Sequence, residues 1–265
     1  MSFVAAILAS KDLRVAVGRV LVLGSLVVVV LHAGAVLGRI TIRPESGVLA
    51  DVFALLDAGE ERSLAAWWTG GLLFAAALAS ALLAWLAAGL PELRRESRAW
   101  WVMTFVFALL SFDESVSLHE RGARWTAAVL DAGSPLAKLG WILPGAALVL
   151  LGVIVLIPAF RALPRRPRTL VIAGLATSIV GAVGMEFAYV MLVDAQVAWR
   201  WVYLVMAIEE AAEIAGVLVI LAGISMALQV AASSGRLTLR YRSSASLTGA
   251  GNGSEAAVSD VLKSR

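Results

Sequence analysis

An all-α, polytopic membrane fold is predicted from three observations: the composition, the spacing of apolar stretches and the distribution of basic residues. Of the 265 residues, 60% are hydrophobic, and the mean hydropathy is +0.88. These values are typical of multi-pass membrane proteins rather than soluble domains. The chain contains no cysteine, which excludes disulfides and thiolate metal ligands.

Six apolar stretches are long enough for helices that cross a hydrocarbon core about 30 Å thick. Residues 1–14 precede them as a short N-terminal segment, and residues 39–63 are expected to form an outer loop that lies at the interface as an amphipathic helix. Residues 233–265 are rich in Ser, Gly and charge and are predicted to be a disordered tail. The six-helix domain covers residues 15–232, with spans at about 15–38, 64–90, 99–121, 139–160, 169–193 and 199–230.

The first apolar stretch also allows a second interpretation. Ala33-Gly34-Ala35 resembles a small-residue cleavage site after a basic start, so residues 1–35 could be a secretory signal. The stretch is nevertheless long enough to cross a membrane, which favours a retained span.

The basic residues predict the orientation. Fifteen of the 22 Lys and Arg residues fall on one side of the six-span topology, in the N-terminal segment with Arg19, the turns 91–98 and 161–168, and the tail. The positive-inside rule therefore places both termini in the cytoplasm, with the chain in the cell membrane, which is the cytoplasmic membrane in a bacterium. The net charge of +3 is accounted for by this topology, so the bilayer and not nucleic acid is the expected partner.

The carboxylates within the predicted spans, and both histidines, all fall in the outer half of the bilayer. An ionised side chain there costs several kcal/mol, about 2.5–3.5 on insertion scales, and usually faces a protein interior, a partner or a pathway. The inner halves of the spans are almost wholly apolar. The residues that share this depth are His32, Asp113, Glu114, His119, Glu120, Glu186, Glu209, Glu210 and Glu213.

Helical geometry groups these side chains further. At 100° per residue, Glu209 and Glu213 are about 40° apart, and Glu210 widens the arc to about 100°. In the third span, Glu114 and His119 point in different directions on a straight helix. We therefore expect either that this helix loosens near Ser117 or that the two residues have separate roles.

Carboxylates and imidazoles in this number suit iron, zinc or manganese. Facing helices of a bundle often hold two metal ions with Glu and His. These ingredients resemble those of carboxylate-bridged di-iron proteins, although the chain has no Glu-x-x-His pair. The expected ligands are Glu120, Glu186, Glu209, Glu213 and His119, followed by Asp113 and His32, while Glu210 and Glu114 are the expected catalytic proton carriers.

This site predicts a membrane metalloenzyme, an oxidoreductase or hydrolase that acts on a lipid-soluble substrate. A proton- or cation-coupled transporter using the same acids is the alternative, and a non-catalytic sensor or assembly protein is a third. Individual residues also have structural alternatives. Glu120 can pair with Arg124 on its own helix, His32 can be a hydrogen-bonded packing residue, Gly181 and Gly184 can allow close helix approach, and Asp113 and Glu114 can pair with Arg39, Arg43, Arg121 or Arg200.

Overall fold

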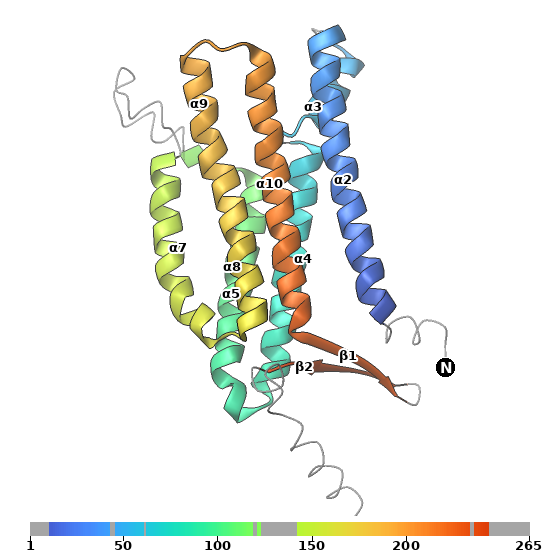
Figure 1. Ribbon diagram of the computed structural model, residues 1–265, viewed down its shortest axis with the longest axis vertical. Helices are drawn as coiled ribbons and strands as arrows, with labels where there is room; N and C mark the ends of the chain where they lie inside the picture. Colours follow the sequence, from blue (N-terminus) through green and yellow to red (C-terminus); the bar gives the residue numbers. More distant parts are fainter. Residues whose placement is uncertain are drawn as a thin grey trace, which may run out of the picture.

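The protein is an elongated bundle of helices (Figure 1). The computed structural model describes residues 11–42, 46–60, 62–118, 121–122, 142–233 and 236–243, most of them helical. Within these ranges, five helical segments are long and apolar enough to cross a membrane, which supports the predicted multi-pass helical membrane protein. They are Val15–Ile42, Leu64–Ala88, Pro91–Val116, Gly145–Ala162 and Arg165–Asp194.

The first three helices are α2 (Lys11–Ile42), the short α3 (Val48–Leu56) and α4 (Leu64–Ala88). The ring of Phe53 on α3 lies over Gly38, where α2 has no side chain. Helix α4 starts at an N-cap, because Ser63 Oγ accepts a hydrogen bond from the Ala66 N–H at 3.1 Å. Helix α4 is joined to α2 by the Trp68 indole, which donates to Ser25 Oγ at 2.9 Å.

A tight turn, η1 (Pro91–Leu93), connects α4 to α5 (Arg94–Val116). Two hydroxyls link these helices: Ser97 Oγ donates to the Ala84 carbonyl and Ser111 Oγ to the Gly70 carbonyl, both at 2.9 Å. Helix α5 ends earlier than the predicted span, because Ser117 adopts a left-handed conformation with φ 51°. The structure thus shows the first of the two alternatives, an interruption of the helix at Ser117.

The next helices are α7 (Ile142–Ala162), α8 (Arg165–Ile179) and α9 (Glu186–Asp194), with a π-helical turn, η3 (Val180–Met185), between α8 and α9. Together α8, η3 and α9 form one long segment. Helix α8 packs closely on α10 (Trp199–Met226). A methyl group at Gly216 would lie 2.6 Å from the Gly174 carbonyl oxygen, so the close contact requires glycine there.

Helix α10 begins beside the end of α9 and runs back along the bundle (Figure 1). Its 28 residues are long enough to cross a membrane, but Glu209, Glu210 and Glu213 set it apart from the five apolar segments. A sixth crossing therefore stays a prediction, although the path of α10 along the bundle favours it.

The chain after α10 differs from the sequence-based expectation. The helix ends at Met226 rather than near residue 230, and an antiparallel hairpin follows where the tail was predicted to begin. Strand β1 (Leu228–Ser233) pairs with β2 (Arg236–Tyr241), from Leu228 opposite Tyr241 to Ser233 opposite Arg236. The physical reason is the alternation of apolar and polar residues in RLTLRY, a period of two that is typical of a strand. Residues 244–265 lie outside the described part of the chain.

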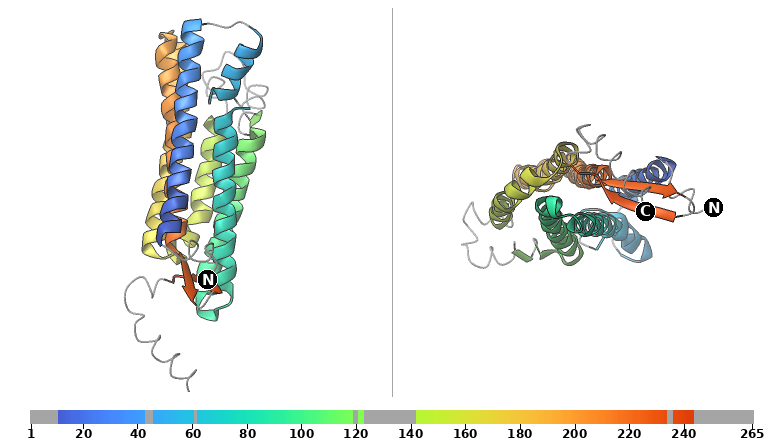
Figure 2. Two further views of the ribbon diagram at one scale, coloured as in Figure 1. Left: turned by 90° about the vertical axis from the view of Figure 1, so that its right-hand side faces the viewer. Right: turned by 90° about the horizontal axis from the view of Figure 1, so that it is seen from below.

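Tyr241 joins the hairpin to the start of α5. Its hydroxyl donates to a Glu96 carboxylate oxygen and accepts from the Trp100 indole at 3.0 Å. The Arg242 N–H also donates to the Ala227 carbonyl at 2.9 Å. Figure 2 shows the hairpin at the same end of the bundle as the turn between α4 and α5.

The predicted basic segments lie at this end of the bundle. The start of α2, η1, the turn between α7 and α8 and the hairpin all lie there, whereas the α2–α3 and α9–α10 connections lie at the opposite end (Figure 1). We call the former the basic end and the latter the far end. This arrangement agrees with the predicted topology, and the side of the membrane that each end faces stays a prediction.

Candidate acidic site

Five carboxylates from two helices interact electrostatically in the half of the bundle nearer the far end. Glu210 interacts electrostatically with Glu213, Glu114 and Glu209, and also with Asp57, which is not one of the five. Glu213 interacts electrostatically with Glu114, Glu209 and Asp113. All five side chains are partly buried. We call them the acidic cluster: Asp113 and Glu114 from α5, and Glu209, Glu210 and Glu213 from α10.

Two glycines lie against this cluster. Gly70 on α4 faces Glu114, where a Cβ atom would lie 3.5 Å from Glu114 Cγ. Gly181 in the π-helical turn faces α10, where a Cβ atom would lie 3.1 Å from Ala212 Cβ and 3.4 Å from Glu213 Cγ. The close approach expected at Gly181 is therefore found. Single π-helical turns inside α-helices often occur at functional sites, and this one lies against the glutamates of α10.

The cluster is a group of interacting charges rather than a complete metal site. Among the residues that the structure describes, no three His, Asp or Glu side chains converge so as to hold a metal ion. Two of the expected ligands, His119 and Glu120, lie outside the described ranges. Glu186 begins α9, directly after the π-helical turn, and the interactions found for Glu210 and Glu213 do not include it.

His32 lies in the interior, with 2% of its surface exposed. Its Nδ1 accepts a hydrogen bond from the Ala58 N–H at 2.8 Å. Nδ1 therefore carries the lone pair, and the proton of the neutral imidazole is on Nε2. A metal ion at Nε2 would require that proton to move to Nδ1, where it would face the Ala58 N–H. This geometry does not suit a metal ligand, and it supports the structural alternative, in which His32 holds the connection between α3 and α4.

The same connection contains a buried acid that the sequence analysis did not single out. Asp57 is 2% exposed. Its Oδ2 is 2.8 Å from Arg39 Nη1, and its Oδ1 accepts from the Gly59 N–H at 3.1 Å and lies 3.5 Å from His32 Nδ1. Arg39 also reaches Glu60 at 3.3 Å. Arg39 thus pairs with two acids of the loop, and not with Asp113 or Glu114 as one alternative had it.

Little in the sequence could have revealed this ion pair. Asp57 directly follows the short apolar run VLADVFALL. It begins an Asp-Ala-Gly turn in a segment that the sequence alone would assign to a surface loop. Its partner is 18 positions earlier, at the end of another helix. Turn residues of this kind usually lie in solvent, and only the packing of α3 on α2 buries the carboxylate.

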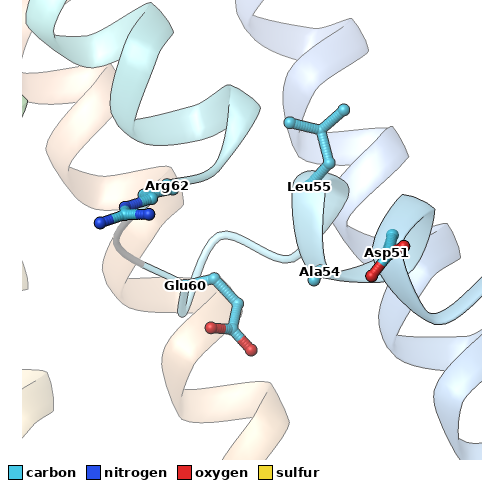
Figure 3. Close-up of a pocket in the computed structure, with 5 residues that line it drawn as sticks. All are labelled: Asp51, Ala54, Leu55, Glu60 and Arg62. Atoms are coloured by element: carbon cyan, nitrogen blue, oxygen red, sulfur yellow. The ribbon is translucent and has the colours of Figure 1, made fainter. Parts of the chain in front are cut away.

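A shallow pocket lies on the outside of this loop. Figure 3 shows its lining, Asp51, Ala54 and Leu55 from α3, and Glu60 and Arg62 from the connection to α4. The pocket shares Glu60 with the Arg39 ion pairs. None of its lining residues belongs to the acidic cluster, so the pocket and the cluster are separate sites.

The other half of the bundle is packed with large apolar side chains. Trp100, Met103 and Phe107 of α5 are all fully buried, between the acidic cluster and the basic end. Within the described part of the chain, the acidic cluster therefore lies in one half of the bundle.

Comparison with known proteins gives one match. A family model described as a domain of unknown function (DUF8692) matches residues 20–228. The matched range runs from α2 to the first residue of β1 and includes every residue of the acidic cluster. No curated protein and no solved structure matches the chain.

Proposed function

We propose, from the site alone, that this chain is a membrane metalloenzyme that acts on a lipid-soluble substrate. The chain belongs to the family described as a domain of unknown function (DUF8692), whose description names no activity. The acidic cluster would bind the metal, iron, zinc or manganese. One observation carries the proposal. The charged groups found to act on Glu210 and Glu213 are all carboxylates.

Such a cluster favours the binding of positive charge. Like charges that share a poorly solvated site oppose one another's ionisation, and protons or a cation relieve this repulsion. A divalent metal ion can neutralise two carboxylates at once and can polarise a substrate or activate water. Glu209 and Glu213, one helical turn apart on α10, and Asp113 on α5 would supply oxygen ligands, and their side chains would have to turn towards one ion to do so.

Three further residues would complete the ligand set. His119 and Glu120 follow Leu118 directly, and Glu186 stands next to the π-helical turn that faces α10. Glu210 and Glu114 remain as proton carriers. His32 is left out of this set, because its Nε2 carries a proton.

The packing of the bundle supports an enzyme more than a transporter. A transporter needs polar access from both sides of the membrane, whereas Trp100, Met103 and Phe107 fill the half towards the basic end. One observation favours the second candidate, a proton- or cation-coupled transporter: the described residues contain no group of three converging ligands, and protons need no such group. A sensor or assembly role would use the same cluster without turnover.

The test is elemental analysis of the purified protein in detergent. We expect about one or two metal ions per chain, as in helical-bundle metal sites, and loss of the metal in the variant E209Q/E213Q. E92Q, in the exposed turn η1, is the control and should keep the metal.

Two results would oppose the proposal. Unchanged metal content in E209Q/E213Q would remove these residues from the ligand set. A wild-type protein that binds none of iron, zinc or manganese after reconstitution would leave the protonated cluster, and proton uptake by proteoliposomes would then test the transporter.

A further inference from the structure

The β-hairpin that follows α10 has one apolar and one polar face. In an antiparallel pair, residues directly opposite one another project from the same side of the sheet, and successive residues alternate between the two sides. The pairs that share the apolar face are Leu228 with Tyr241 and Val230 with Leu239. Between them, Gln229 pairs with Arg240 on the other face, and both residues are exposed.

The apolar face begins on the bundle and continues beyond it. At the base of the hairpin, Leu228 and Tyr241 pack against the buried core. The next pair on this face is less covered, because Val230 is half-buried and Leu239 is 37% exposed. Figure 1 shows the hairpin running outward from the bundle, roughly across the helix axes. An apolar surface is thus left partly open beside the bundle.

The base of the hairpin is fixed near one end of the apolar segment Pro91–Val116. This segment has 26 residues and is about 39 Å long at 1.5 Å per residue, which matches a bilayer with its headgroups, about 40–45 Å thick. Tyr241 is bonded to Glu96 and Trp100, which lie five and nine residues after Pro91. The hairpin therefore lies at the level where headgroups meet hydrocarbon, and its open apolar surface is next to lipid.

Positive charge surrounds the hairpin at this level. The four segments of the basic end contain thirteen Lys and Arg residues and three acids, in residues 11–19, 91–98, 161–168 and 236–242. Arg240 is exposed, and Arg242 directly follows β2. Neither arginine forms an ion pair within the described part of the chain. Guanidinium groups bind phosphate strongly, and anionic lipids present phosphate in the headgroup layer.

We infer that the β-hairpin lies on the membrane surface at the basic end, with Val230 and Leu239 against lipid and its arginines on the phosphates of anionic phospholipids. Amphipathic elements bind membranes in this way, through buried apolar area and attraction to anionic lipids. Arginine side chains are long enough to reach the headgroups from the polar face. An isolated two-stranded hairpin is marginally stable in water, so the lipid also covers its apolar face. This surface is separate from the acidic cluster, and the inference does not depend on the proposed metal.

Site-specific fluorescence quenching tests the position of the apolar face. The chain has no cysteine of its own, so bimane can be attached to the full-length variant L239C in nanodiscs that contain a phospholipid with a nitroxide on its acyl chain, close to the headgroup. The nitroxide quenches bimane at short range. We expect strong quenching in L239C and in V230C, on the same face, and clearly weaker quenching in T238C, on the opposite face of the same strand.

The headgroup preference tests the arginines. Nitroxide-labelled phosphatidylglycerol, which is anionic, should quench bimane in L239C more strongly than labelled phosphatidylcholine at the same mole fraction. Adding R240Q/R242Q should lower this preference about 2- to 5-fold, because each arginine near a membrane surface attracts anionic lipid. Adding R165Q/R166Q instead is the matched control. It removes two exposed arginines from the start of α8, at the same end of the bundle, and should leave most of the preference intact.

Two results would overturn the inference. Quenching in L239C and V230C as weak as in T238C would mean that another part of this chain or a second copy covers the apolar face. Equal quenching by the two lipids, or a preference that survives R240Q/R242Q, would mean that the hairpin arginines do not bind anionic headgroups. Because V230C reports on the same face as L239C, a folding defect in one variant leaves the other to decide.

Discussion

At the scale of single residues, Arg39 and Asp57 form a close ion pair, with 2.8 Å between Nη1 and Oδ2. The carboxylate is buried, and the guanidinium is 27% exposed. A buried ion pair adds little net stability compared with apolar packing, but loss of one partner leaves an uncompensated buried charge. The pair therefore matters chiefly because it fixes the α3–α4 connection over His32.

Removal of Arg39 should destabilise the protein. In R39M, Asp57 loses its partner, and we expect the free energy of unfolding to fall by about 1–3 kcal/mol, less than for a fully buried pair because Arg39 is partly exposed. Thermal unfolding in detergent measures this effect. The exposed Arg62 in the same connection provides the control R62M, which should unfold like the wild type.

The double variant R39M/D57N should regain much of that loss, because it removes the stranded charge as well. If R39M alone unfolds at the wild-type temperature, the ion pair does not stabilise the connection.

At the scale of elements, the β-hairpin is held to α5 by a tyrosine whose titration can be followed. Burial raises the pKa of Tyr241 above its ordinary value of 10.0, and the hydrogen bond that it donates to Glu96 raises the pKa further. The hydroxyl must keep its proton to make this bond. The docked hairpin is therefore fully stabilised below pH 10, and this contribution decreases as the pH rises above 10.

Absorbance of tyrosinate measures this directly, because the chain has only three tyrosines. The difference between the wild type and Y241F should show no titration near pH 10 and an onset at higher pH. In E96Q, the acceptor is no longer a carboxylate, so the titration of Tyr241 should move down towards its ordinary value. A Tyr241 that titrates at the ordinary value in the wild type would mean that the hairpin is not docked.

At the scale of the whole molecule, the open question is the number of membrane crossings. Helix α10 begins at the far end and leads into a hairpin at the basic end, where Tyr241 contacts Glu96 and Trp100. Its three glutamates are partly buried and interact with one another and with carboxylates of α5. A sixth crossing is therefore compatible with an acidic helix.

Single cysteines test the topology, because the chain has none of its own. In spheroplasts of an expression host, a membrane-impermeant maleimide should label A195C directly but label R165C and R240C only after permeabilisation. All three positions are exposed.

Two labelling patterns would contradict the topology, each in a different respect. Direct labelling of both A195C and R240C would show that α10 does not cross. Labelling of R165C without A195C would reverse the predicted orientation.

The sequence by itself determined the class of the protein and the approximate ends of its apolar helices. Both depend on hydrophobicity, which is a local property of the chain and needs no partner. It also placed the carboxylates of α5 and α10 at a common depth, because helix length and alternating direction settle depth without any contact. The angles along the third span left two alternatives, a loosened helix near Ser117 or separate roles for Glu114 and His119, and the left-handed Ser117 showed that the helix is interrupted there.

Only the tertiary structure decided which polar groups meet. The Arg39–Asp57 pair, the hydrogen bond between His32 and Ala58, and the contact of Tyr241 with Glu96 each join residues from separate elements. Their partners depend on how helices pack, and many arrangements share one hydrophobic pattern. The buried Asp57 shows this best, because only the packing of α3 on α2 removes this turn residue from solvent. In the hairpin, the alternation in RLTLRY is local, but its pairing with β1 and its contact with α5 are tertiary.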